Sequence, residues 1–296
     1  MFLSAFFIFY TTVAQPKDTA TVTVASIEKM MDYQTGQIKL LSGNATLRVP
    51  KGFKFINAKN AQYVLHDLWG NPEDTTVQGA ILPEDATVTA AGCWLFTVTF
   101  DGMGFVKDDD AKDVNYDDLL AEMKTDISNA NPEREKAGYG KIELVGWASK
   151  PFYDANKKVL HWAKELKFNN DTINTLNYDL RILGRKGVFV LSAVGSINQL
   201  SEIKPNIDQI ISSIEFNEGE KYANFDSSTD EVAAWTIGGL VAGKVLAKVG
   251  FFAILAKFGK VIFVALIAAF AAIKKFIFGK KDQEVSKPEI ASKEVE

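Results

Sequence analysis

Within the C-terminal third of the chain, the stretch Trp235 to Phe278 constrains the fold most because it is apolar over most of its length. Its centre, Val261 to Ile273, reads VIFVALIAAFAAI and carries no charge. Apolar residues extend this run back to Val249, with only Lys257 and Lys260 interrupting. A helix needs about 20 mostly apolar residues to cross a bilayer. The stretch from Val249 to Ile273 supplies that length, so we expect a membrane anchor that follows a water-soluble domain.

A buried globular helix or a helix lying in the membrane interface is the alternative for this region. A helix lying in the interface would gather its charges on one stripe. The lysines here do not gather in that way: Lys244, Lys248, Lys257, Lys260, Lys274 and Lys275. Gly239 and Gly243 form a small-xxx-small pair that predicts a second, closely packed helix over Trp235 to Ala256. These glycines could equally mark bends, so one helix and a helical hairpin both stay open.

The first residues predict an export signal. Met1 to Val13 is a short apolar run, and Thr12-Val13-Ala14 places small residues before Gln15, as a signal peptidase requires. No Lys or Arg precedes the run, so an uncleaved anchor is the alternative. We expect cleavage after Ala14.

Charge beyond the apolar stretch sets the expected orientation, because positive residues stay on the cytoplasmic side. The lysines concerned are Lys274, Lys275, Lys280 and Lys281. We therefore predict a protein of the bacterial inner (cytoplasmic) membrane, with the main domain outside the cytoplasm and the C-terminal tail inside. The predicted partition is signal 1–14, lead-in 15–42, extracytoplasmic domain 43–228, anchoring helical region 229–279 and a charged, disordered tail 280–296.

Composition and charge limit the kinds of partner and cofactor that we expect this chain to bind. The net charge is −4, and the exported part has no basic face, which argues against nucleic acid. The expected partners are the lipid bilayer and another envelope or membrane protein. Cys93 is the only cysteine, so no disulfide can form within the chain, and His66 and His161 lie far apart. A calcium loop counted from Asp113 fails because Asp118 and Lys124 replace the required Gly and Glu. We expect no metal and no cofactor.

Alternating apolar residues predict antiparallel strands through the middle of the chain. Two hairpins are clearest: 141–148 with 158–166, and 172–183 with 187–193 across Gly184-Arg185-Lys186. Further strands are expected at 45–49 and 53–55, joined as a hairpin by Pro50-Lys51-Gly52, and at 77–82 and 94–100. The run Asp108-Asp109-Asp110 is typical of a solvated loop.

Helices are predicted where a capping residue precedes apolar residues at helical spacing. Asn57 caps residues 58–68, Asn115 caps residues 116–128, and a helix over 197–214 is interrupted or restarts at Pro205. Together these elements predict an α+β domain in which helices pack on an antiparallel sheet.

Several motifs in a fixed order resemble those of the domain of unknown function 2167 family, which is described as bacterial membrane-anchored proteins. The motifs are Gly43-Asn44-Ala45-Thr46-Leu47, Pro50-Lys51-Gly52-Phe53, Leu68-Trp69-Gly70-Asn71-Pro72, Gly104-Phe105-Val106-Lys107-Asp108-Asp109-Asp110-Ala111, Gly146-Trp147 with Pro151 and Tyr153, Asn177-Tyr178, Leu183-Gly184-Arg185 with Gly187, and Phe216-Gly219-Tyr222-Phe225. The resemblance covers the chain from about Gly43 to the anchor. It implies a signal, an exported domain and a C-terminal membrane segment, and it brings no activity. More weakly, the hairpin near the start and the terminal helix look like PsbP-type α/β/α sandwiches, an analogy of fold alone.

The best polar constellation is Asn177, Asp179 and Arg181 on one face of a strand, with Arg185 in the turn. Arginine donates in a fixed fork that suits an anionic group, so these residues are candidates for binding. A solvated face with Asp179 paired to an arginine is the alternative. Four residues are candidates to line an apolar pocket, although aromatic residues on hairpins more often belong to the core: Trp147, Pro151, Tyr153 and Trp162.

We therefore predict an extracytoplasmic binding or interaction module. One alternative is a hydrolase-like envelope enzyme that uses Asp179, Arg181, Arg185 and His161, although no catalytic motif is present. The other is a structural partner of another membrane protein that acts through Gly239 and Gly243.

Overall fold

The computed structural model describes residues 23–243 apart from Gly70, Pro72, Ala91, 137–139 and Asn170. The chain divides into two compact units, 1–245 and 246–296. The predicted signal 1–14, the membrane span Val249 to Ile273 and the tail 280–296 lie outside the described residues.

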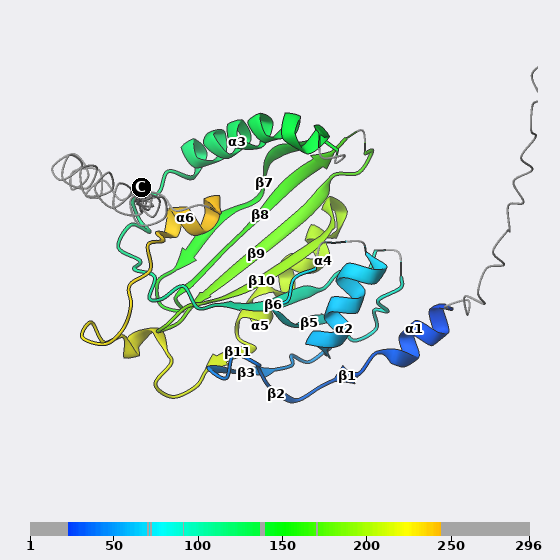
Figure 1. The fold of residues 1–296 in the computed structure, drawn as a ribbon, viewed down its shortest axis with the longest axis horizontal. Coiled ribbons are helices and arrows are strands. Elements are labelled where there is room, and N and C mark those ends of the chain that lie inside the picture. Colours follow the sequence, from blue (N-terminus) through cyan, green and yellow to red (C-terminus); the bar gives the residue numbers. More distant parts are fainter. Residues whose placement is uncertain are drawn as a thin grey trace, which may run out of the picture. The chain divides into compact units, whose positions relative to one another are not determined.

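An antiparallel sheet of eight strands forms the centre of the first unit, in the order β1-β4-β5-β6-β10-β9-β8-β7 (Figure 1). Its strands are β1 (Tyr33–Gln34), β4 (Phe53–Asn57), β5 (Val77–Pro83), β6 (Phe96–Asp101), β7 (Ile142–Asp154), β8 (Val159–Phe168), β9 (Thr175–Leu183) and β10 (Val188–Ser196). The hairpins β7–β8 and β9–β10 confirm the two clearest predictions from alternation. The fold is thus α+β, as the sequence predicted.

The predicted hairpin across Pro50-Lys51-Gly52 is wrong. The strand before this turn, β3 (Ala45–Arg48), belongs to a separate small sheet with β2 (Gln37–Lys39) and β11 (Ile214–Phe216). The strand after it, β4, pairs with β1 and β5 in the large sheet. Alternation had located both strands, but the turn between them carries the chain from one sheet to the other.

One face of the large sheet, which we call the closed face, is covered by the short helices after β10. These are η2 (Ile197–Gln199), α4 (Leu200–Ile203), η3 (Lys204–Asn206) and α5 (Ile207–Ile211). Their buried residues Ile203, Ile207 and Ile210 join Tyr178 and Leu180 of β9 in the main hydrophobic core. The predicted helix over 197–214 is therefore broken around Pro205 and ends before β11.

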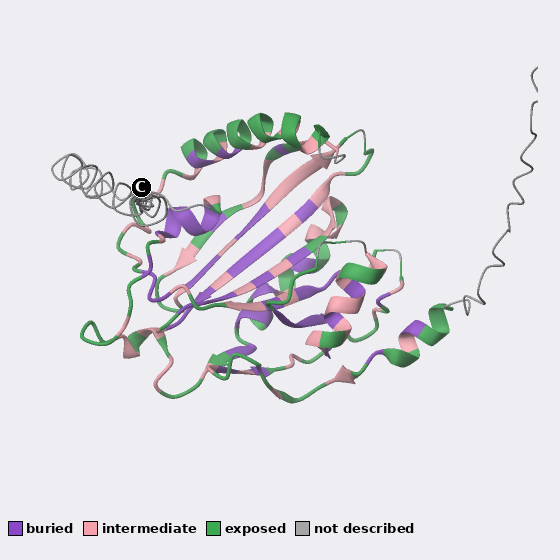
Figure 2. Cartoon of the chain, viewed as in Figure 1, coloured by how far each residue is buried: buried purple, intermediate pink, exposed green. Residues whose placement is uncertain are grey.

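The other face, which we call the open face, carries helices toward its two edges (Figure 1). At the β4–β5 edge lie α1 (Val24–Met30), α2 (Ala58–Gln62) and the π-helix η1 (Tyr63–Leu68), which share a second core cluster with Ile56 and Leu82. Toward β7 lies α3 (Tyr116–Lys136). Between them, residues of β8, β9 and β10 range from buried to partly exposed (Figure 2).

Asn115 begins α3 as predicted, because its side-chain oxygen accepts the backbone N–H groups of Asp117 and Asp118. The helix runs on through Pro132 to Lys136, beyond the predicted end at residue 128. The side chain of Asn131 ties this extension to β7, since it both donates to and accepts from the backbone of Ile142 at 2.9 Å.

The last described helix, α6 (Ile237–Ala242), lies at the start of the apolar stretch Trp235 to Phe278. The Asp110 carboxylate accepts the backbone N–H groups of Ile237 and Gly238 at 3.2 and 3.3 Å, which satisfies the first turn. Gly243 adopts a left-handed conformation (φ 72°) and ends α6. The described part of the helix predicted over Trp235 to Ala256 thus ends at Gly243, and residues 244–256 lie outside the described residues. In the described part of the chain, no helix has the length and apolar character of a membrane span.

A short parallel bridge precedes α6 and joins Phe105 to Val232. Phe105 donates to the carbonyl of Glu231 at 2.8 Å, and Ala233 donates to the carbonyl of Phe105 at 2.9 Å. Gly104 permits this approach, because a Cβ there would lie 2.8 Å from the Glu231 oxygen. The segment that leads into α6 is thus bonded to the loop that holds Asp110.

Candidate functional site

Strand register lines up side chains in a row across the open face. Thr97 of β6 pairs with Ser192 of β10, Ser192 pairs with Asp179 of β9, and Asp179 pairs with Trp162 of β8. Residues directly opposite on neighbouring antiparallel strands point to the same face. Asp179, one of the polar residues of β9 that the sequence placed on one face, therefore lies between Ser192 and Trp162 on that face.

A charged group forms around Asp179, whose residue is only 5% exposed. Its Oδ1 accepts a hydrogen bond from Ser192 Oγ at 2.8 Å and lies 3.4 and 3.5 Å from the two terminal nitrogens of Arg181. Its Oδ2 lies 3.5 Å from Lys164 Nζ. We call Asp179, Arg181, Lys164 and Ser192 the Asp179 cluster. Two cations here share one carboxylate, and both of their contacts with it are long for ion pairs.

Two polar atoms beside this cluster are buried and have no hydrogen-bond partner among the described residues: Trp162 Nε1 and Asn177 Oδ1. The ring of Trp162 also lies under the Arg181 guanidinium, 5.0 Å from centroid to carbon, which favours a cation–π contact. Buried polar groups in folded proteins are nearly always paired with protein, water or ligand. The surroundings of the Asp179 cluster therefore retain hydrogen-bonding capacity.

A hollow of about 430 Å³ adjoins the cluster on the side of α2, and we call it the sheet pocket. Its floor comes from β6 and β10, and one wall comes from η1 and the residues after it. The lining residues are Gln62, Leu65, Trp69, Asn71, Asp74, Val77, Ala90, Gly92, Cys93, Leu95, Thr97, Ser192 and Val194. Ser192 belongs to both features, so the sheet pocket and the Asp179 cluster are adjacent at this residue.

The π-helix that walls the sheet pocket is stabilised locally. Asn71 donates to the Leu65 carbonyl through its backbone N–H (2.9 Å) and its side-chain amide (3.0 Å). Trp69 Nε1 donates to the Val88 carbonyl at 3.4 Å. Single π-helical turns are rare and often occur at functional sites. The motif around Trp69 and Asn71 thus shapes one wall of the hollow.

Cys93 lines the same hollow, and burial raises the pKa of its thiol to about 11. At neutral pH the thiol is therefore protonated, and the thiolate is the nucleophilic form. Cys93 contributes a weakly polar wall to the sheet pocket.

Trp147 and Tyr153, the aromatic candidates on β7, form hydrogen bonds within the domain. Trp147 Nε1 donates to the backbone carbonyl of Tyr116 in α3 at 3.2 Å, and Tyr153 donates to Asp108 at 2.7 Å. Their Cα partners on β8 are Lys164 and Leu160, so both tie β7 to its surroundings. Neither residue lines the sheet pocket.

His161 lies on the opposite face of the sheet from Asp179. Its Nδ1 is 3.2 Å from the Tyr178 hydroxyl, and Tyr178 belongs to the closed-face core. Burial lowers the pKa of His161. The structure therefore does not bring His161 together with Asp179 and Arg181.

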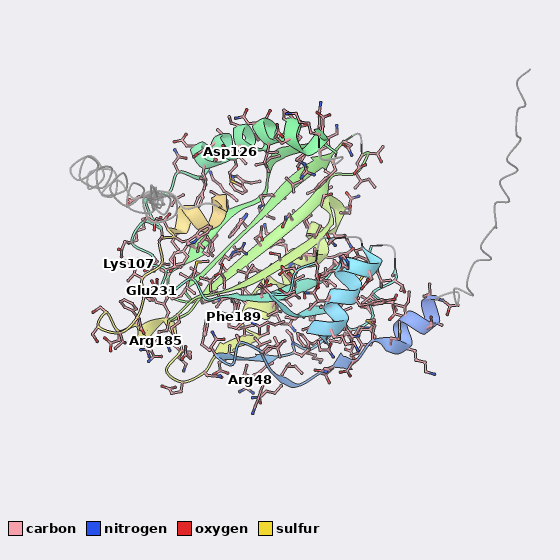
Figure 3. The ribbon with its side chains drawn as sticks, viewed as in Figure 1. Arg48, Lys107, Asp126, Arg185, Phe189 and Glu231 are labelled. Atoms are coloured by element: carbon pink, nitrogen blue, oxygen red, sulfur yellow. The ribbon has the colours of Figure 1, made fainter. Side chains whose placement is uncertain are left out.

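Arg185 lies at the end of the sheet that also holds Lys107 and Glu231 (Figure 3). Its Nε and Nη2 donate to the two oxygens of Asp230 at 2.7 and 3.0 Å, and Nη1 donates to the Gly219 carbonyl at 3.1 Å. The hydrogen bond to Asp230 raises the pKa of Arg185, and the same pairing lowers the pKa of Asp230. We call these two residues the Arg185–Asp230 pair. Its fork is occupied by the protein itself, so Arg185 holds the loop before α6 in place.

A second cluster at this end, which we call the Asp108 cluster, was missed by sequence reasoning. Asp108 accepts from Tyr153 Oη (2.7 Å), Lys158 Nζ (2.7 Å) and Tyr222 Oη (3.0 Å). Burial raises the pKa of Asp108, but these hydrogen bonds outweigh burial and hold the pKa below its usual value. The acidic run is thus an internal junction in which Asp108 and Asp110 each have a structural role.

Among residues 23–243 that the structure describes, no three His, Cys, Asp or Glu side chains gather in a way that could hold a metal ion. The open face combines an apolar hollow, a buried carboxylate and two nearby cations, an arrangement that could contact a ligand.

Solved structures with a similar arrangement share little sequence with this chain. The solution structure of the cyanobacterial PsbP protein (CyanoP) from Synechocystis is 10% identical, covers 62% of this chain and 92% of its own, and gives a TM-score of 0.33. A point mutant of the protein Mog1 is 11% identical, covering 63% of this chain and 96% of its own, with a TM-score of 0.33. The crystal structure of the Saccharomyces cerevisiae Ran-binding protein Mog1p is 12% identical, with 66% and 100% coverage and a TM-score of 0.32.

Comparison with curated proteins gives no match. A family model described as "Protein of unknown function (DUF2167)" matches residues 32–271. The match spans most of the described domain and continues into the apolar C-terminal third.

Proposed function

The chain belongs to the DUF2167 family of proteins of unknown function, and from its own geometry we propose that it is a binding module of the bacterial envelope. The proposed ligand site is the sheet pocket together with the Asp179 cluster. The observation that carries this proposal is Ser192, which lines the sheet pocket and also donates to the buried Asp179 carboxylate at 2.8 Å.

The size and lining of the sheet pocket support a small-molecule ligand. Ligand sites in proteins are mostly apolar hollows of roughly 300–1,000 Å³ that have a few polar groups for orientation. The sheet pocket has that volume, apolar walls such as Leu65 and Trp69, and polar groups such as Thr97 and Ser192 on its floor. The alternative enzyme would need His161 and Arg185 beside Asp179, and the fold separates these residues.

The proposed location rests on the sequence at the two ends of the chain. Met1 to Ala14 has the character of an export signal, and Val249 to Ile273 has the length of a membrane span, followed by lysines. We propose that the domain faces the extracytoplasmic side, with the bilayer and an envelope or membrane protein as partners. We also propose that the domain has a PsbP-like α/β/α arrangement.

Protease protection on intact spheroplasts tests the location. With one tag before Gly43 and another after Glu296, we expect external protease to cut only the first. Protection of both tags would contradict the export of the domain and turn the search toward the cytoplasm.

A pocket-filling variant tests the site. Thr97→Trp places a large ring in the sheet pocket, whereas Thr46→Trp makes the same change on β3, outside it. We expect an extract of envelope small molecules to raise the melting temperature of the natural chain and of Thr46→Trp, but not that of Thr97→Trp. An equal rise in all three proteins would place the binding site elsewhere.

A further inference from the structure

We infer that the sheet pocket and the Asp179 cluster together bind an amphipathic anion, a molecule with an apolar body and one carboxylate- or phosphate-class head group. This inference rests on the proposed function and names the ligand class of the same site. The apolar body would lie in the sheet pocket, and the head group would lie over β9, against Lys164 and Arg181.

The apolar body is inferred from the walls of the hollow. Leu65, Trp69, Val77 and Leu95 line it, and Val194 on its floor is 50% exposed although it stands on a central strand. An apolar side chain left open on a sheet face gains from being covered, because covering it removes apolar surface from water. A ligand with a hydrocarbon or ring body provides that cover, and a wholly polar ligand does not.

The position of the head group follows from strand register. Val194, which lines the sheet pocket, pairs with Asn177, and Asn177 pairs with Lys164. Neighbouring strands lie about 5 Å apart, so the cations begin roughly one to two strands from the pocket floor. A molecule that fills the hollow and extends across β9 therefore brings its end to the Asp179 cluster.

The sign of the head group follows from the charges in the cluster. Lys164 and Arg181 supply two positive charges against the single carboxylate of Asp179. A cationic head group would be repelled by two like charges. An anionic head group would bring the net charge of the cluster to zero. Both side chains remain partly accessible, at 19% for Lys164 and 16% for Arg181.

The long contacts of the two cations with Asp179 also allow a ligand oxygen to replace them. Arg181 makes its short hydrogen bond, 2.9 Å, with the carbonyl of Leu180, and it reaches Asp179 only at 3.4 and 3.5 Å. Charge-assisted hydrogen bonds of full strength are shorter, at about 2.7–2.9 Å. A carboxylate or phosphate oxygen of a ligand can therefore bind these two cationic side chains without breaking a short ion pair. Asp74, on the exposed rim of the hollow, is held by Thr76 and lies outside the Asp179 cluster.

Photo-crosslinking of the full-length chain in its membranes tests the inference. The probe is dodecanoate with a diazirine at its far end, and the matched control is the dodecanol with the same diazirine. We expect the acid to label peptides that contain Leu65–Trp69 or Cys93–Thr97, roughly tenfold more than the alcohol does, since one charge-assisted contact is worth about that factor.

Charge-changing variants test whether the head group contacts Lys164 and Arg181. Lys164→Gln is expected to lower labelling by the acid roughly tenfold, and Lys164→Arg to restore most of it. Lys150→Gln removes the same charge from β7, where Lys150 pairs with Asp117 at 2.9 Å, and should leave labelling unchanged. Arg181→Gln provides a second variant of the cluster, and the melting temperature of each protein shows that it is folded.

Two contrary outcomes separate this inference from the proposed function. Equal labelling of the sheet pocket by acid and alcohol, unaffected by Lys164→Gln, would overturn the anionic head and leave the binding site standing. Labelling that avoids the sheet pocket with both probes, or that persists in Thr97→Trp, would overturn both. Competition by free dodecanoate would support a soluble amphiphile, and competition by phosphatidylglycerol vesicles alone would support a bilayer lipid.

Discussion

Two arginines of the β9–β10 hairpin, each beside an aspartate, are used in different ways. Arg185 places two nitrogens on the two oxygens of Asp230 at 2.7 and 3.0 Å and its third on a carbonyl. Arg181 reaches a single oxygen of Asp179 at 3.4 and 3.5 Å and shares that carboxylate with Lys164. An arginine whose three nitrogens each have a short partner fixes the chain, whereas an arginine with long, shared contacts is suited to accept a ligand.

The same contrast holds for the regions around them. The end of the sheet, with the Asp108 cluster and the Arg185–Asp230 pair, is built from short contacts between distant segments. In the middle of the open face, Asp179 is buried, but its contacts with Lys164 and Arg181 are long. Substitutions at the sheet end should therefore change stability, and substitutions in the Asp179 cluster should change binding.

The largest loss of stability is expected from Asp108→Ala. The change removes the acceptor of three hydrogen bonds and leaves the partly buried Lys158 without its carboxylate. We expect the free energy of unfolding to fall by about 3 kcal/mol, measured by urea titration with tryptophan fluorescence. The exposed neighbour is the control, since Asp109→Ala should change this energy by less than about 0.5 kcal/mol. Equal effects of the two substitutions would show that the hydrogen bonds of Asp108 do not stabilise this end of the sheet.

Exchange of each arginine for lysine sharpens the comparison. Lysine keeps the charge but loses the fork, so Arg185→Lys should lower the melting temperature, whereas Arg181→Lys should change it much less. Differential scanning fluorimetry on the two variants measures the contrast. A larger drop for Arg181→Lys would mean that the Asp179 cluster, and not the Arg185–Asp230 pair, is the stabilising one.

Acid should weaken the sheet end through Asp108. Hydrogen bonds keep the pKa of this carboxyl below its usual 3.8 despite burial, so the ionised form is favoured in the folded state. Its contribution to stability is therefore complete above the unfolded pKa and is lost as the pH falls through the lower folded pKa. The melting temperature of the natural chain should fall more steeply below about pH 4 than that of Asp108→Asn. Parallel curves for the two proteins would show that Asp108 does not carry this dependence.

Ser192→Ala should have the smallest effect on stability. It removes one hydrogen bond to Asp179, which keeps its contacts with Arg181 and Lys164, so a loss of about 1 kcal/mol is expected in urea unfolding. Ser201→Ala, which removes an exposed 3.3 Å hydrogen bond to the Asn198 carbonyl, is the control. A loss as large as that of Asp108→Ala would indicate that the Asp179 cluster also holds the fold together.

Local patterns in the sequence predicted local structure well. Alternation located the hairpins β7–β8 and β9–β10, and capping chemistry located the start of α3 at Asn115. The separate partners of β3 and β4 were not predictable in this way, because alternation identifies a strand and says nothing about the strand it pairs with.

Only part of the candidate site could be predicted, because alternation does not reveal which strands are neighbours. The shared face of Asn177, Asp179 and Arg181 follows from alternation within one strand. The contribution of Ser192 and Lys164 depends on the register between strands, which no single segment reveals. Asp108 looked like a loop residue because its partners Tyr153, Lys158 and Tyr222 stand 45, 50 and 114 residues away along the chain.

The attachment of α6 has a mechanical consequence. Asp110 holds the first turn of this helix, and the bridge between Phe105 and Val232 holds the segment before it. A force applied to α6 would therefore be borne by the loop that carries both Asp108 and Asp110, and through Asp108 by the end of the sheet.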